Sequence, residues 1–218
     1  DLVQEFGAQP AKVDVVPNPI DAARIRARGA EMVEYPFAGS GRCHLITVGR
    51  LSPEKGLDFL ARSLAGVDRG AFDWVIVGDG PERGRIRSLV HEAGMEDRVH
   101  FAGMCENPWS LMRHADILVH PSRSEAFPNV FGEAFALGLP VIASDCSPGV
   151  REYLSDGACG ILVPVGDEGL MAAAISALAS DPETRQKLAR AGLERVVELN
   201  PEASVANFEE ILREAGNG

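Results

Sequence analysis

Hydrophobic residues in this chain gather in six short continuous runs, with no regular alternation of apolar and polar positions. The runs lie at residues 45–48, 74–77, 99–101, 117–119, 141–143 and 161–163. Continuous apolar runs of this length are typical of strands that are buried on both faces of a sheet. The pattern therefore predicts six buried strands.

Segments with helical spacing of apolar residues lie between these runs and after the last one. They span residues 56–64, 81–93, 108–114, 128–137, 150–154, 168–180, 182–199 and 202–215. Strand–helix alternation with short connections gives right-handed crossovers and a parallel sheet. We expect a single α/β domain with a doubly wound, Rossmann-like sheet. Such sheets bind ligands beyond the carboxyl ends of their strands. We therefore expect ligand-binding residues in the loops that follow strands.

Residues 1–41 are predicted to form a lead-in segment, and residues 42–218 the domain itself. The lead-in holds an extended apolar run at 12–16, a short helix from about Asp21 and a loop at 36–41. The chain begins without Met, which is compatible with a fragment of a longer protein.

Composition narrows the classes of partner. The 218 residues, 45% hydrophobic and 24% charged, fit one globular domain. A net charge of -11 disfavours nucleic acid and anionic bilayers, because both would repel the chain. The four cysteines lack metal-type spacing, which favours reduced thiols and a cytoplasmic location. None of the five histidines shows ligand spacing, and we expect no metal site; His120 is interpreted as an ordinary strand-end residue.

Two cations stand in the loop after the first predicted strand. Arg50 lies at the strand end and Lys55 lies near the start of the next helix, within the sequence GRLSPEKG. An Arg fork and a Lys point charge can converge on one phosphate. The alternative is a surface turn with two solvated charges.

The loop at 78–84 carries the loose dinucleotide-type pattern GxGxxxG. A dinucleotide site also needs an acidic residue at the end of the next strand, to hold the ribose. The strand at 99–103 offers none, and Pro81 removes one N–H from the turn. An NAD-dependent enzyme is therefore disfavoured.

The richest stretch is HPSRSEAFPNVFGEA at 120–134. Pro128 is expected to start a helix, whose first free N–H groups would then form an anion site. These groups belong to Asn129, Val130 and Phe131.

Two carboxylates flank this expected anion site. Glu125 lies in the loop before the helix, and Glu133 lies one helical turn after Asn129. Hydroxyl-binding carboxylates on both sides of a phosphate site match the order of a nucleotide sugar: sugar, diphosphate, ribose. Taken singly, Glu125 also fits a solvated loop charge, and Glu133 fits a carboxylate favoured by the helix macrodipole.

These motifs together resemble the C-terminal domain of retaining GT-B glycosyltransferases, in the large family four. The resemblance runs from about Val15 to the C-terminus. The segments that carry it are GRLSPEKG, VGDGPE, HFAG, HPSRSEAFPNVFGEA, LGLPVIASDCSPGVREYL and GILVPVGD.

The resemblance implies roles for individual residues. Arg50 and Lys55 would bind the donor diphosphate, and the backbone N–H groups of Asn129 and Val130 would contact phosphate or sugar. Glu125 would be the catalytic-site glutamate that holds the donor sugar, and Glu133 would hold the ribose. The loop at Met104 would meet the base.

It also implies a reaction: a hexose moves from a nucleotide diphosphate sugar, expected to be UDP-linked, with retention and without a bound metal or other cofactor. The acceptor would be a surface glycan or lipid-linked sugar of polysaccharide biosynthesis. In the family an N-terminal domain holds the acceptor and would make most of any peripheral membrane contact. No counterpart precedes Asp1, so we expect this chain alone to catalyse little or nothing.

Two positions depart from the family pattern. Ala126 stands where Gly is commoner, and Val150 stands where a subgroup acting on bacterial surface glycans has Pro. Two further functions stay open: a nucleotide-sugar epimerase on a similar fold, and a nucleotide-binding or assembly module without chemistry.

Overall fold

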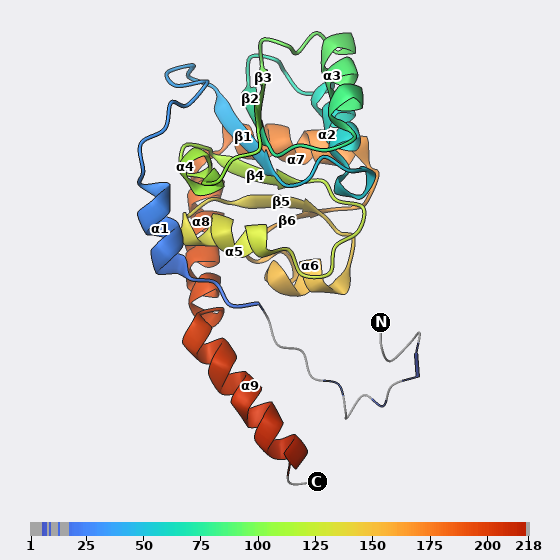
Figure 1. Cartoon of the computed structure of the whole chain (residues 1–218). Coiled ribbons are helices and arrows are strands. Elements are labelled where there is room, and N and C mark those ends of the chain that lie inside the picture. The colour runs from blue at the N-terminus through green and yellow to red at the C-terminus, as the bar shows by residue number, and fades with distance from the viewer. Residues whose placement is uncertain (1–5, 8, 10–12, 14–17, 217–218) are drawn as a thin grey trace.

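Six parallel strands form one sheet in the order β3-β2-β1-β4-β5-β6 (Figure 1). The computed structural model describes residues 6, 7, 9, 13 and 18–216. The strands are β1 Cys43–Val48, β2 Phe72–Val77, β3 Val99–Gly103, β4 Ile117–His120, β5 Val141–Ser144 and β6 Gly160–Val163. The predicted doubly wound parallel sheet is confirmed. Each strand extends one or two residues beyond one end of its apolar run.

Helices cover both faces of this sheet. They are α1 Ala22–Gly29, α2 Leu57–Leu64, α3 Arg83–Glu92, α4 Pro108–Met112, α5 Asn129–Ala136, α6 Pro148–Tyr153, α7 Glu168–Ser180, α8 Pro182–Glu198 and α9 Pro201–Gly216. Two short 3-10 helices, η2 Pro53–Lys55 and η3 Ser155–Gly157, were not expected from the sequence.

Two hydrophobic cores result, one on each face of the sheet. In β1, Leu45 joins the core formed with α2, α3 and α7, while Ile46 joins the core formed with α1, α4, α5 and α6. Both side chains are fully buried. Successive residues of one strand thus face opposite cores, which is why the strands read as continuous apolar runs.

Several helices start one or two residues away from the sequence prediction, and two of them carry loops of the candidate site. The helix expected from Pro81 begins at Arg83, and the Glu82 N–H donates to Leu51 O at 2.9 Å. Pro128 is the N-cap of α5 and not its first residue. Differences of one or two residues are ordinary at helix ends, where the last turn is often irregular.

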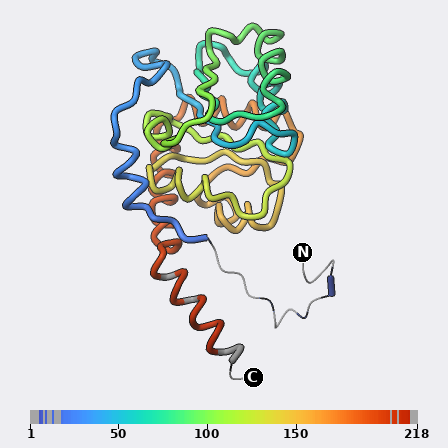
Figure 2. The backbone as a smooth tube through the Cα atoms, in the orientation of Figure 1, coloured from blue at the N-terminus to red at the C-terminus, as the bar shows by residue number. Residues whose placement is uncertain are grey.

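The lead-in is tied to the domain. The short helix expected from about Asp21 is α1, which the Asp21 side chain caps, and Ile20 and Ile25 are buried against the core that contains α5. The predicted boundary at 41/42 is not tested, and the extended run at 12–16 lies almost wholly outside the described residues. At the other end, α9 extends away from the body of the domain (Figure 2). Among helices of the described residues, none is long and apolar enough to cross a membrane.

Candidate functional site

The strand order reverses between β1 and β4. The chain leaves β1 toward β2 on one side of the sheet, and leaves β4 toward β5 on the other. The loops after β1 and β4, residues 49–56 and 121–128, therefore lie side by side at the carboxyl edge of the sheet, and the chain continues from them in opposite directions. This is the position at which open α/β sheets bind their ligands.

Glycines let the neighbouring loops touch backbone to backbone. Gly56 has φ +66°, and a Cβ built on it would lie 2.1 Å from the carbonyl oxygen of Pro121. A Cβ on Gly78 would lie 1.9 Å from Gly49 O. Only glycine fits these two contacts without displacing backbone.

Four side chains meet where the β1 and β4 loops touch. Lys55 Nζ donates to Glu125 Oε1, and His120 Nε2 lies 2.9 Å from the same oxygen. Ser122 Oγ donates to Glu125 Oε1 at 3.0 Å and lies 3.0 Å from His120 Nε2. The Glu125 side chain is 12% exposed. Two predicted site residues, Lys55 and Glu125, are thus brought into direct contact.

This cluster keeps Glu125 ionised. Burial by itself raises the pKa of a carboxyl group, but hydrogen bonds from His120 and Lys55 outweigh it and lower the pKa of Glu125 to about 2. A carboxylate at neutral pH can accept hydrogen bonds from sugar hydroxyls. The sequence did not assign His120 or Ser122 to the site. Their only signal was that they lie within five positions of Glu125 in the sequence.

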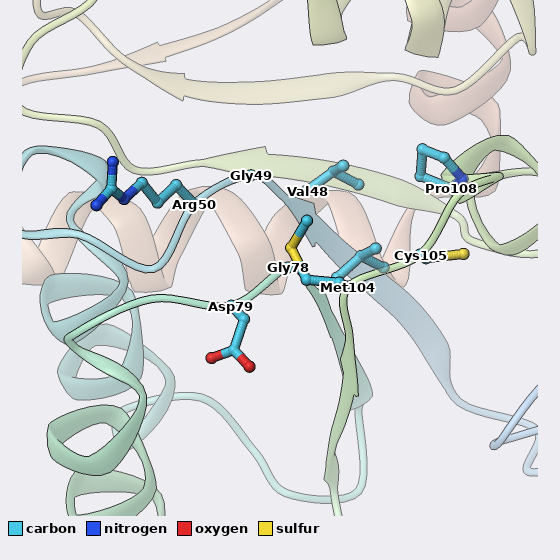
Figure 3. A pocket seen from close by; sticks show the side chains of 9 residues that line it. Val48, Gly49, Arg50, Gly78, Asp79, Met104, Cys105 and Pro108 are labelled. Atoms are coloured by element: carbon cyan, nitrogen blue, oxygen red, sulfur yellow. The ribbon is translucent and has the colours of Figure 1, made fainter.

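A pocket of about 450 Å³ opens beside Arg50 at the ends of β1 and β2 (Figure 3). It is lined by Val48, Gly49, Arg50, Val77, Gly78, Asp79, Met104, Cys105 and Pro108. Most of this lining is apolar, and the charged side chains of Arg50 and Asp79 lie toward one end. Among the described residues no hydrogen bond or ion pair holds the Arg50 guanidinium. The pocket therefore combines an apolar surface, against which a planar base could pack, with a cation that has no partner among the described residues.

The loop glycines at 78–80 serve packing between loops. The Gly80 N–H is taken by Asp79 Oδ1 at 2.8 Å, and the Gly78 N–H donates to Gly103 O at 2.7 Å. A Cβ on Gly80 would lie 2.3 Å from Leu51 O. The N–H groups of Gly78 and Gly80 are therefore already bonded and are not free to hold a phosphate.

The N-terminus of α5 carries two free donors. The N–H groups of Asn129 and Val130 have no acceptor among the described residues, but the Phe131 N–H donates to Pro128 O at 3.1 Å. The prediction that Phe131 contributes a third free N–H is wrong, because the first turn of α5 closes on the carbonyl of its proline cap. Asn18 Nδ2 also donates to Asn129 Oδ1 at 2.8 Å.

Glu133 lies one turn further along α5 and is half-buried. Burial raises its pKa, and Trp109 of α4 opposes that rise only in part. The residue before Trp109, Pro108, lines the pocket of Arg50 and Met104. Glu133 itself is not among the residues that line this pocket, whereas Glu125 is paired with Lys55 at the β4 loop.

The departures from the family pattern are accommodated locally. Ser155 and Asp156 are the non-glycine residues with positive φ in the described part of the chain, so Ala126 needs no glycine conformation. The Val150 N–H donates to Ser147 Oγ at 3.2 Å, a bond that Pro could not make. No group of three or more His, Cys, Asp or Glu side chains that could hold a metal occurs among the described residues.

Comparisons with known proteins agree on one family. The sequence profile described as Glycosyl transferases group 1 matches residues 38–195. D-inositol 3-phosphate glycosyltransferase from Acidothermus cellulolyticus is 33% identical over 233 residues, covering 98% of this chain and 50% of that protein. Alpha-D-kanosaminyltransferase from Streptomyces kanamyceticus is 33% identical over 171 residues, covering 77% and 44%.

Solved structures share the fold. A glycosyltransferase from Rickettsia africae superposes with a TM-score of 0.85 at 18% identity, covering 98% of this chain and 60% of that one. HepE from Anabaena, solved in complex with UDP, gives 0.75 at 22% identity, covering 95% and 54%. The chain spans about half the length of the curated relatives named above. This chain has the Rossmann-like fold of one half of a GT-B architecture. The profile match and these relatives show that it belongs to the glycosyl transferases group 1 family.

Proposed function

We propose that this chain is the donor-binding domain of a glycosyltransferase that moves a hexose from a nucleotide diphosphate sugar to an acceptor with retention of configuration. The observation that carries the proposal is the Lys55–Glu125 pair, which lies at the switch point of the sheet. It combines a cation for phosphate with an ionised carboxylate for sugar hydroxyls.

The proposed donor lies along the carboxyl edge of the sheet. Its base occupies the apolar pocket by Met104, and its ribose hydroxyls donate to Glu133. Its diphosphate meets Arg50, Lys55 and the free N–H groups at the start of α5, and its sugar meets Glu125. UDP is the expected nucleotide, and HepE, a protein of the same fold, was solved with UDP.

In transfer, the bond between the anomeric carbon and the diphosphate oxygen breaks, that carbon bonds to an acceptor hydroxyl oxygen on the same face, and the hydroxyl proton passes to the leaving diphosphate, on which negative charge develops. Arg50, Lys55 and the N–H groups of Asn129 and Val130 would stabilise that charge. In the free chain Lys55 is paired with Glu125, so the donor phosphate takes over part of that pairing. The scheme uses no resident metal ion or other cofactor.

The acceptor, proposed to be a surface glycan or lipid-linked sugar, would be held by a further domain of the full-length protein. That protein would work in the cytoplasm in polysaccharide biosynthesis, with peripheral membrane contact made outside this chain. The two curated relatives are named for transfer of a sugar, and the chain spans about half of each.

Product analysis with the full-length protein tests the proposal. Release of a nucleoside diphosphate that depends on acceptor, with a product of the same anomeric configuration as the donor by NMR, is expected. Isomerised donor without acceptor would instead indicate an epimerase. Donor binding with neither reaction would indicate a module without chemistry.

A further inference from the structure

Arg123 and Asp58 form a bidentate ion pair outside the cluster of Lys55 and Glu125. Arg123 Nη1 donates to Asp58 Oδ1 at 2.8 Å, and Nη2 donates to Oδ2 at 2.9 Å. Asp58 lies in the first turn of α2 and its side chain is 4% exposed. Such a paired fork fixes geometry as well as charge.

Arg123 also donates hydrogen bonds to two backbone carbonyl oxygens that precede Asp58 in the chain. Its Nη1 donates to Pro53 O at 2.6 Å, and its backbone N–H donates to Glu54 O at 2.7 Å. One residue of the β4 loop is thus tied to residues 53, 54 and 58. Lys55 lies between these attachment points, and Glu125 follows Arg123 by two residues.

We propose that Arg123 and Asp58 are positioning residues, which clamp the β1 and β4 loops so that Lys55 and Glu125 are held together at the donor site. The functional meaning of the clamp rests on the proposed donor-binding function. Neither residue needs to touch the donor.

Two further arginines lie beside Asp58 in addition to Arg123. Arg62 Nη1 donates to Asp58 Oδ2 at 3.3 Å, and Arg85 Nη2 lies 3.1 Å from the same oxygen. Burial raises the pKa of Asp58, but hydrogen bonds from Arg123 and Arg62 outweigh it and lower the pKa to about 2. Arg62 belongs to α2 itself and also pairs with Glu168 at 2.5 Å, so it neutralises Asp58 without joining the two loops.

This difference provides a matched pair of variants. Arg123→Lys and Arg62→Lys each keep one positive charge beside Asp58 and lose the arginine fork. Only the first removes the side-chain bonds that join the β4 loop to Pro53 and Asp58, while the backbone bond from residue 123 to Glu54 O remains in every variant. Asp58→Asn breaks the same tie from the other side.

The pKa of Glu125, followed by carboxyl ¹³C NMR, measures whether its partners stay in place. The groups that face Glu125 are Lys55, His120, Ser122 and Cys146. In Arg123→Lys and Asp58→Asn this pKa should rise by about one pH unit or more, because Lys55 and His120 lose their fixed positions. Arg62→Lys should leave it within about 0.3 of the original. Thermal melting of each variant confirms that it is folded.

An unchanged Glu125 pKa in both folded clamp variants would overturn the proposal, as would an equal rise in Arg62→Lys. The titration uses no nucleotide. A chain that binds no nucleoside diphosphate would therefore contradict the proposed function while this test still decided whether the clamp exists.

Discussion

Lys55 Nζ donates a hydrogen bond to Glu125 Oε1, although 70 positions separate the two residues in the sequence. One belongs to the loop after β1 and the other to the loop after β4. Their meeting follows from the strand order, which places β1 beside β4 where the winding of the sheet reverses. A local motif at each loop thus becomes one site only through the topology.

Removal of the Lys55 charge should weaken nucleotide binding. In Lys55→Met, affinity for the nucleoside diphosphate should fall roughly 10- to 150-fold, because a charge-assisted hydrogen bond contributes about 1.5–3 kcal/mol. Isothermal titration calorimetry measures this. Lys187→Met, at an exposed position on α8, is the charge-matched control and should bind as the original chain does. Equal affinities in the two variants would remove Lys55 from the site.

Glu133 should distinguish ribose from deoxyribose. The original chain should prefer a ribonucleoside diphosphate over its 2′-deoxy form, and Glu133→Ala should reduce that preference by about 1–3 kcal/mol, since the hydroxyl loses its acceptor. Competition binding with the two nucleotides gives the ratio directly. A preference that survives unchanged in the variant would place the ribose elsewhere.

The same carboxyl group predicts a pH dependence of binding. Burial raises the pKa of Glu133, so it takes up a proton at a higher pH than an exposed glutamate does. Protonation weakens the group as an acceptor, and ribonucleotide affinity should begin to fall while the pH is still above 4.5, the ordinary pKa of a glutamate. Affinity measured as the pH is lowered from 8 to 4 should show this decline, and Glu133→Gln should abolish it.

Glu125 should contribute to stability only above acid pH. Its pKa falls from an ordinary 4.5 to about 2 in the folded chain, so its contribution is complete above 4.5 and is lost as the pH falls toward 2. Between pH 7 and pH 3 the free energy of unfolding in urea should therefore drop less in Glu125→Gln, by about 1–2 kcal/mol. Glu194→Gln, at an exposed position on α8, is the control and should follow the original chain.

Gly56 should resist substitution. In Gly56→Ala the new Cβ would lie 2.1 Å from Pro121 O, at a residue with φ +66°. The backbone conformation alone costs about 1–2 kcal/mol, and separation of the loops adds to it. Gly84→Ala in α3, where no atom lies within 4 Å of the new Cβ, should instead be neutral or stabilising by up to about 1 kcal/mol. Denaturant unfolding of both variants makes the comparison.

The strands and the loops of the site could be predicted from local sequence. Runs such as Leu45–Val48 face a core on both sides of the sheet, so nearly every position in them is apolar and the strand is visible in the sequence. Arg50, Lys55 and Glu125 were found because they follow such runs. Their positions needed only the rule that ligands bind beyond the ends of parallel strands.

Contacts between loops could not be predicted in this way. The bonds of Arg123 with Asp58 depend on how two distant segments pack, and nothing in the neighbourhood of either residue shows it. The same holds for the Phe131 N–H, which bonds to the carbonyl of Pro128. His120 was set aside because a strand-end histidine has no distinctive pattern, and its partner is visible only in the folded loop.

Thermal melting of this chain with UDP, GDP, ADP and NAD tests whether the site around Lys55 binds a nucleoside diphosphate. A ligand that binds only the folded form raises the melting temperature by mass action. The account predicts stabilisation by one nucleoside diphosphate, none by NAD, and loss of the effect in Lys55→Met. No shift with any nucleoside diphosphate at millimolar concentration, or an equal shift in Lys55→Met, would contradict it.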